Sequence, residues 1–156
     1  MLSQAARAVG PSGQVVAEPD PRNRLQLENN INLNGIANAT IVPLAAWSHA
    51  GKVRWQGDSA EPVWHKIDES SGIGLVDTVT VDDVVRRFAL TRVDWIKLDV
   101  EGAEQSIQRF HPVLFIEVHG TLHELEAYLP RFGYSIDKTI FGGITENHGH
   151  VLAAVK

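Results

Sequence analysis

Short apolar runs alternate with helical patterns along this sequence, and this alternation constrains the fold more than any other feature. Runs typical of buried strands occupy residues 14–17, 39–46, 95–100, 112–118, 134–140 and 151–155. Helical patterns are predicted at residues 21–34, 80–89 and 122–131. The runs at 95–100 and 112–118 are expected to be strands buried on both faces. Together these elements predict a layered α/β fold with a mostly parallel sheet.

Local signals set the ends of two predicted helices. Asp20 can cap a helix whose first turn contains Pro21, and Gly35 is a natural C-terminal stop. Thr80 and Asp83 have the spacing of a capping box. The residues after Thr80 follow the helical spacing of one apolar face: Val81, Val84, Val85, Phe88 and Ala89.

Two regions depart from the alternation. Residues 48–77 lack a clear period, which indicates a loop or a short antiparallel excursion. The runs at 134–140 and 151–155 are joined by a Gly-rich turn without a helix. We therefore expect them to form an antiparallel hairpin at one edge of the sheet.

Composition removes several classes of function. The 156 residues suit one domain, contain no cysteine and carry a formal net charge of −5. Disulfides, thiolate metal sites and a cysteine nucleophile are therefore excluded, and a cytoplasmic location fits. No basic stripe indicates nucleic-acid binding, and no apolar run is long enough to span a bilayer.

Polar residues follow several predicted strands at their carboxyl ends, where parallel sheets bind ligands. The first is Glu18, and an acid in this position can accept hydrogen bonds from both hydroxyls of a ribose. Alternatively, Glu18 caps the helix behind Pro19.

A second polar group comprises Asp99, Glu101 and Glu104, three carboxylates beside the glycine at position 102. Such a cluster can hold a cation, orient a substrate hydroxyl or act as a base. It can equally be a helix N-terminus lined with acids that suit the helix dipole.

His119 follows the strand at 112–118 and lies two residues after Glu117. Residues at i and i+2 on a strand point the same way, so the carboxylate could raise the basicity of the imidazole for proton abstraction. A structural role for His119 is the alternative. His148 and His150 flank Gly149 in the expected hairpin turn, where they are either metal ligands or solvated side chains.

Five stretches in this order resemble the FkbM-type methyltransferase family, over nearly the whole chain. They are Val15-Val16-Ala17-Glu18-Pro19-Asp20-Pro21, Asn30-Ile31-Asn32-Leu33-Asn34-Gly35, Thr78-Val79-Thr80-Val81-Asp82-Asp83, the block from Val93 to Glu104, and Pro112-Val113-Leu114-Phe115-Ile116-Glu117-Val118-His119. The strongest part is Ile96 to Glu104.

The resemblance implies a Rossmann-like fold, S-adenosylmethionine as methyl donor and an oxygen acceptor on a sugar, polyketide or similar small metabolite. Glu18, with the adjoining Pro19, matches the family's ribose-binding acid, and Ala46 is expected near the adenine. Asp99 is expected to face the methyl-transfer cleft and to contribute to cofactor binding. Asp99, Glu101 and His119 are the candidates for orienting or deprotonating the acceptor, and we expect no zinc or redox cofactor.

Two departures from the family pattern lead us to expect a truncated methyltransferase. The family's first strand and glycine-rich cofactor turn would stand upstream of Met1, and residues 2–10 resemble the tail of the helix after that turn. Without that strand, the strands at 14–17 and 95–100 would each have an unpaired edge. In addition, residues 105–111 leave room for hardly any helix, and the crossover is expected to be too short for a parallel unit.

Two functions of other classes stay open. The chain could be a non-catalytic remnant that binds a partner or acts as a scaffold, including a homo-oligomer formed through an unpaired sheet edge. It could also be a hydrolase with a metal on the carboxylate cluster. For the methyltransferase, the expected partner is a small-molecule acceptor, with neither nucleic acid nor membrane.

Overall fold

The computed structural model describes residues 2–56, 66–67, 74–98, 104–140, 143–144 and 148–155. The chain divides into two compact units, Met1–Val79 and Thr80–Lys156. No helix among the described residues is long and apolar enough to cross a membrane.

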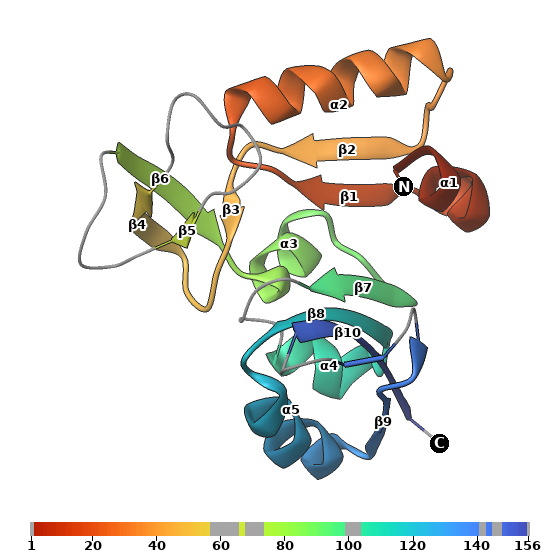
Figure 1. Cartoon of the computed structure of the whole chain (residues 1–156). Coiled ribbons are helices and arrows are strands. Elements are labelled where there is room, and N and C mark those ends of the chain that lie inside the picture. Colours follow the sequence, from red (N-terminus) through yellow and green to blue (C-terminus); the bar gives the residue numbers. More distant parts are fainter. Residues whose placement is uncertain are drawn as a thin grey trace. The chain divides into compact units, whose positions relative to one another are not determined.

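The first unit begins with two parallel strands and two helices (Figure 1). These elements are α1 (Leu2–Val9), the 3₁₀ helix η1 (Gly10–Ser12), β1 (Gln14–Ala17), α2 (Pro21–Leu33) and β2 (Ala39–Val42). Strand β1 pairs with β2 in parallel, with Gln14 opposite Ala39. The predicted helix signals are confirmed, because Asp20 caps α2 and Gly35 turns the chain beyond it with a φ of 59°.

The predicted strand at 39–46 is wrong as one element, because it is two strands in two sheets. Strand β2 ends at Val42, whereas β3 (Ala45–Ala46) pairs in parallel with β6 (Gly74–Val79). Pro43 between them has no backbone N–H for a sheet, and the amide of Leu44 bonds back to the Val42 carbonyl at 2.9 Å. The chain therefore turns away at Pro43.

The poorly patterned region contains an antiparallel excursion, which confirms one of the two expectations for residues 48–77. Its strands are β4 (Gly51–Gln56), β5 (Lys66–Ile67) and β6, in the sheet order β3-β6-β4-β5. Strand β4 is antiparallel to both β5 and β6. Val53 and Val79 are buried in this sheet.

The second unit is a four-stranded mixed sheet with helices (Figure 1). Its elements are α3 (Val81–Arg87), β7 (Trp95–Leu98), α4 (Glu104–Phe110), β8 (Val113–His119), α5 (Leu122–Tyr128), the 3₁₀ helix η2 (Leu129–Phe132), β9 (Tyr134–Asp137) and β10 (His148–Val155). The strand order is β7-β8-β10-β9. Strands β7 and β8 are parallel, and β10 is antiparallel to both of its neighbours. The predicted C-terminal antiparallel hairpin is thus confirmed.

The crossover from β7 to β8 corrects the expectation that residues 105–111 hold almost no helix. Helix α4 spans Glu104–Phe110, and β7 and β8 are parallel. The connection runs from residue 99 to residue 112, which meets the minimum of about 10–12 residues for a parallel crossover. Residues 99–103 belong to the crossover as well, and counting them supplies the missing length.

The two faces of this sheet differ. Leu114, Ile116, Val118, Val151 and Ala153 are buried in one cluster. The helices cover this face with Ile107 of α4 and with Leu122, Leu125 and Tyr128 of α5. The alternating residues of the same strands lie on the other face and include Trp95, which is 54% exposed. The expectation of burial on both faces is therefore wrong for β7, whereas in β8 Phe115 lies on this second face and is only 9% exposed.

An α/β class is confirmed, but a mostly parallel sheet is not. Among the described strands, three pairs are parallel and four are antiparallel. Of the described strands, only β2 pairs with β1 and only β8 pairs with β7. Within the described part of the chain, each of these two strands is therefore paired on one side alone.

Candidate functional site

Glu18 stands directly after β1, at the carboxyl end of a parallel strand pair. Its backbone N–H donates to the Val42 carbonyl at 3.0 Å, and its side-chain Oε1 accepts from the Asp20 N–H at 2.9 Å. The carbonyl of Pro19 accepts from Arg24 Nη1 at 2.8 Å. Backbone and side-chain bonds therefore fix the Glu18 carboxylate at the position predicted for a ribose-binding acid.

The helix cap belongs to Asp20 and not to Glu18. Asp20 is buried, and its Oδ1 accepts from the backbone N–H groups of Arg22 at 2.6 Å and Asn23 at 3.2 Å. Burial acts to raise the pKa of Asp20, but the hydrogen bonds from Arg22 and Asn23 outweigh it, so the pKa lies below its ordinary value. The alternative role predicted for Glu18 is thus filled by its neighbour.

Ala46 lies in β3, opposite Val79 of β6, and is partly buried. The next residue, Trp47, donates its backbone N–H to the Val79 carbonyl at 3.0 Å. Its indole Nε1 is buried, and no acceptor for it exists among the described residues. A buried donor without a partner costs about 1–3 kcal/mol, so this N–H is suited to a bound acceptor atom. No pattern in the sequence singles out Trp47.

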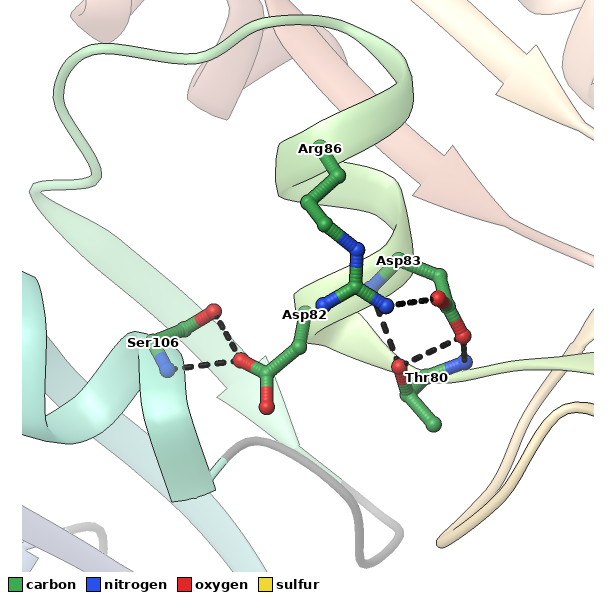
Figure 2. A network of polar contacts seen from close by, with 5 residues as sticks. All are labelled: Thr80, Asp82, Asp83, Arg86 and Ser106. Carbon is green, nitrogen blue, oxygen red and sulfur yellow. Dashed lines mark hydrogen bonds and ion pairs between the residues drawn. The ribbon is translucent and has the colours of Figure 1, made fainter.

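Asp99 and Glu101 lie outside the described residues. The described elements that flank them are β7, which ends at Leu98, and α4, which begins at Glu104. Helix α4 is held at its start by Asp82 of α3, as Figure 2 shows. Asp82 is 8% exposed, and its Oδ1 accepts hydrogen bonds from both the backbone N–H of Ser106, at 2.6 Å, and the Ser106 hydroxyl.

The capping box that sets Asp82 in place is the one predicted from sequence. Thr80 Oγ1 accepts from the Asp83 N–H at 2.9 Å, and the Asp83 carboxylate accepts from the Thr80 backbone N–H (Figure 2). The bond from the Thr80 hydroxyl is the largest influence on the Asp83 carboxyl and lowers its pKa, with the Arg86 guanidinium adding to the effect. Helix α3 thereby starts at a fixed residue and directs Asp82 toward α4.

Glu117 and His119 share the exposed face of β8. His119 Nε2 lies 3.4 Å from Glu117 Oε1, and the side chains are 49% and 30% exposed. The predicted side-by-side arrangement of this carboxylate and imidazole is confirmed. The pair stands near the carboxyl end of the parallel strands β7 and β8, where the fold predicts a ligand site.

His148 and His150 join this pair, which corrects their assignment to a turn. Strand β10 begins at His148, and its register places His148 opposite His119 and His150 opposite Glu117. His150 Nε2 lies 3.8 Å from Glu117 Oε2, and the rings of His119 and His148 meet edge to face at 5.8 Å. The apolar run at 151–155 continues backward with one small or apolar residue at every second position, Gly149, Val151 and Ala153, and this was the sequence signal for the longer strand.

A lysine and two aromatic rings complete the cluster on this face. Lys97 Nζ lies 3.7 Å from Glu117 Oε2. The Phe115 ring stacks on His150 at 5.1 Å and on Trp95 at 5.9 Å. We name Glu117, His119, His148, His150 and Lys97 the β8–β10 cluster.

The chemistry open to the β8–β10 cluster is proton transfer. An imidazole within ion-pair distance of a carboxylate can accept a proton near neutral pH, and the carboxylate stabilises the imidazolium that forms. Within the part of the chain that the structure describes, no group of three or more histidine and acidic side chains is arranged to hold a metal ion.

Comparison with known proteins identifies the family. The family model described as Methyltransferase FkbM domain matches residues 2–136. In fold, the chain is similar to the crystal structure of methyltransferase FkbM from Methylobacillus flagellatus KT, with a TM-score of 0.62 and 20% identity. The match covers 92% of this chain and 36% of that protein, so the chain spans about a third of its length. No curated protein sequence matches. Because the family model covers most of the sequence, the chain belongs to the FkbM methyltransferase domain family.

Proposed function

We propose that this chain is an S-adenosylmethionine-dependent methyltransferase domain that methylates a hydroxyl oxygen of a sugar, polyketide or similar small metabolite. The observation that carries the proposal is the fixed carboxylate of Glu18 at the carboxyl end of β1, in a chain of this family. The cofactor supplies a methyl group on a positively charged sulfur.

The residues of the first unit fit this cofactor in two respects. The Asp20 N–H occupies only part of the acceptor capacity of Glu18, because a carboxylate offers about four lone-pair sites. The remaining lone-pair sites of this carboxylate accept hydrogen bonds from the two ribose hydroxyls. The buried indole N–H of Trp47, one residue after Ala46, donates to an acceptor atom of the adenosyl group. The family resemblance assigns Pro19 and Ala46 to cofactor binding as well, and it assigns Asp99, which lies outside the described residues, to the same cofactor.

His119 accepts the proton that the acceptor hydroxyl loses. An alcohol is a weak nucleophile, so methyl transfer to it is accelerated by a base in hydrogen-bonding reach. Glu117 stabilises the resulting imidazolium from 3.4 Å. Asp99 and Glu101, the other two candidates from the sequence, orient the acceptor.

Calorimetric titration with S-adenosylhomocysteine tests cofactor binding in Glu18→Gln and in the matched control Glu28→Gln, an exposed site on α2. In Glu18→Gln the side-chain amide keeps one acceptor oxygen but loses the charge, so we expect binding about 10-fold weaker or more. The control should bind like the wild type. Equal affinity of wild type and Glu18→Gln would contradict the ribose role, and a folded wild type without binding would contradict the function.

A second candidate function rests on the unpaired edge of β7. Among the described residues this edge has no partner strand, and Trp95 beside it is half exposed. An open strand edge favours pairing with another chain, including a second copy of this one. Concentration-dependent dimerisation in sedimentation, without cofactor binding, would favour a non-catalytic scaffold.

We also propose a cytoplasmic location, a small-molecule acceptor as the partner, and no nucleic acid or membrane as partners. The absence of cysteine supports the cytoplasmic location, and the net charge of −5 argues against nucleic acid as a partner.

A further inference from the structure

The Glu117 carboxylate lies between two imidazoles that come from different strands. Its Oε1 is 3.4 Å from His119 Nε2, and its Oε2 is 3.8 Å from His150 Nε2. The antiparallel register fixes this arrangement, because His150 is the direct partner of Glu117 across β8 and β10. One carboxylate is therefore shared by two imidazoles.

The orientation of His150 is set by packing. Its ring stacks on Phe115 with an interplanar angle of 14°, and Phe115 stacks in turn on Trp95 at 20°. The His150 side chain is 35% exposed, which leaves a path for protons to and from solvent. His150 thus has both a fixed position beside Glu117 and access to water.

We propose that His150 is a positioning and proton-holding residue coupled to His119 through Glu117, so that the two imidazoles and the carboxylate bind one proton as a unit. The catalytic role of His150 rests on the proposed function. The acceptor oxygen gains the methyl group as the methyl–sulfur bond breaks with its electron pair staying on sulfur, and the acceptor proton passes to His119. Because both imidazoles share Glu117, a proton can then leave to water from His150. It need not leave from His119, the ring that faces the acceptor.

The physical basis is repulsion between like charges that share one counter-ion. The first proton gives one imidazolium facing a carboxylate, whereas a second proton sets two imidazolium ions and Lys97 against that single negative charge. We therefore expect the second proton to bind less readily than the first. On the described strands of this face, the charged and titratable groups are Lys97, Glu117, His119, His148, His150 and Asp137.

The test is an NMR pH titration of the histidine ring nitrogens in the ¹⁵N-labelled chain without cofactor. In the wild type, His119 and His150 should each show a two-step curve, whereas His123, exposed on α5, should titrate in one step. In His150→Gln the amide still donates to Glu117 but takes up no proton. His119 should then lose the step that depends on His150, and any coupling that stays comes from His148, whose ring lies 5.8 Å away.

His123→Gln is the matched control and should leave the His119 curve unchanged. One-step curves for both wild-type histidines, or an unchanged His119 curve in a folded His150→Gln variant, would overturn the proposal. The wild-type curves decide the matter even if the variant does not fold.

This titration is independent of methyl transfer. Two-step curves in a chain that does not bind S-adenosylhomocysteine would support the coupled site and contradict the methyltransferase. Cofactor binding by a chain whose His119 and His150 titrate independently would support the methyltransferase and contradict the coupled site.

Discussion

The two faces of the sheet in the second unit contrast sharply, although the same strands form both. One face buries Leu114, Ile116 and Val151 beneath helices. The other carries Glu117, His119 and His150, each of them partly exposed, beside a stack of aromatic rings. Alternation along each strand thus separates stability from chemistry, and changes on the two faces should have different consequences.

The largest expected effect belongs to the buried face. Leu114 has no exposed surface, so Leu114→Ala should lower the free energy of unfolding by about 2–5 kcal/mol through lost burial and a cavity. Leu152→Ala, on the opposite face of β10, is the matched control and should cost less. Urea denaturation measures both, and equal losses would contradict the separation of the two faces.

The next effect belongs to the contact between α3 and α4. Asp82→Ala removes the acceptor of two hydrogen bonds and leaves the buried Ser106 donors unpaired, at a cost of about 1–3 kcal/mol. Asp82→Asn keeps an acceptor oxygen and should lose less. Thermal unfolding compares them, and a wild-type melting temperature for Asp82→Ala would show that the contact contributes nothing.

A smaller effect should appear in acid at the start of α3. The pKa of Asp83 is lowered in the folded chain, so its contribution to stability is present above its unfolded pKa of about 4 and is lost as pH falls through the lower folded value. The stability difference between wild type and Asp83→Asn should therefore shrink below about pH 4. Unfolding measured across this range tests the sign, and a difference that grows in acid would contradict it.

The smallest effect on stability is expected on the polar face. Glu117→Gln loses partly exposed ion pairs, which contribute about 0–1 kcal/mol to the free energy of unfolding. Urea denaturation measures the difference between this variant and the wild type. A large loss of stability would show that Glu117 serves folding as much as the buried residues do.

Local signals in the sequence predict local structure well here. Asp20 and Thr80 cap the helices predicted for them, because a cap depends on residues two or three positions away. The break at Pro43 was missed, since the apolar run continues through it while the partner strand changes. The change of partner strand at Pro43 depends on strands that are distant in the sequence, so no local pattern predicts it.

The candidate site shows the same difference between local contacts, which the sequence predicts, and long-range contacts, which it does not. Glu117 and His119 lie on one strand, and their contact follows from a spacing of two residues. His150 reaches the same carboxylate only through the register of β10 against β8, which the sequence does not specify. The exposure of Trp95 was also missed, because an apolar run does not reveal which of its faces a helix covers.

The most direct test of the central claim is an NMR titration of the ¹⁵N-labelled chain with S-adenosylhomocysteine, following the indole N–H of Trp47. A methyltransferase domain that binds the adenosyl group through its first unit predicts a saturable shift of this resonance, weakened in Glu18→Gln and unchanged in Glu28→Gln. A well-dispersed spectrum in which no resonance moves on addition of the ligand would contradict the claim.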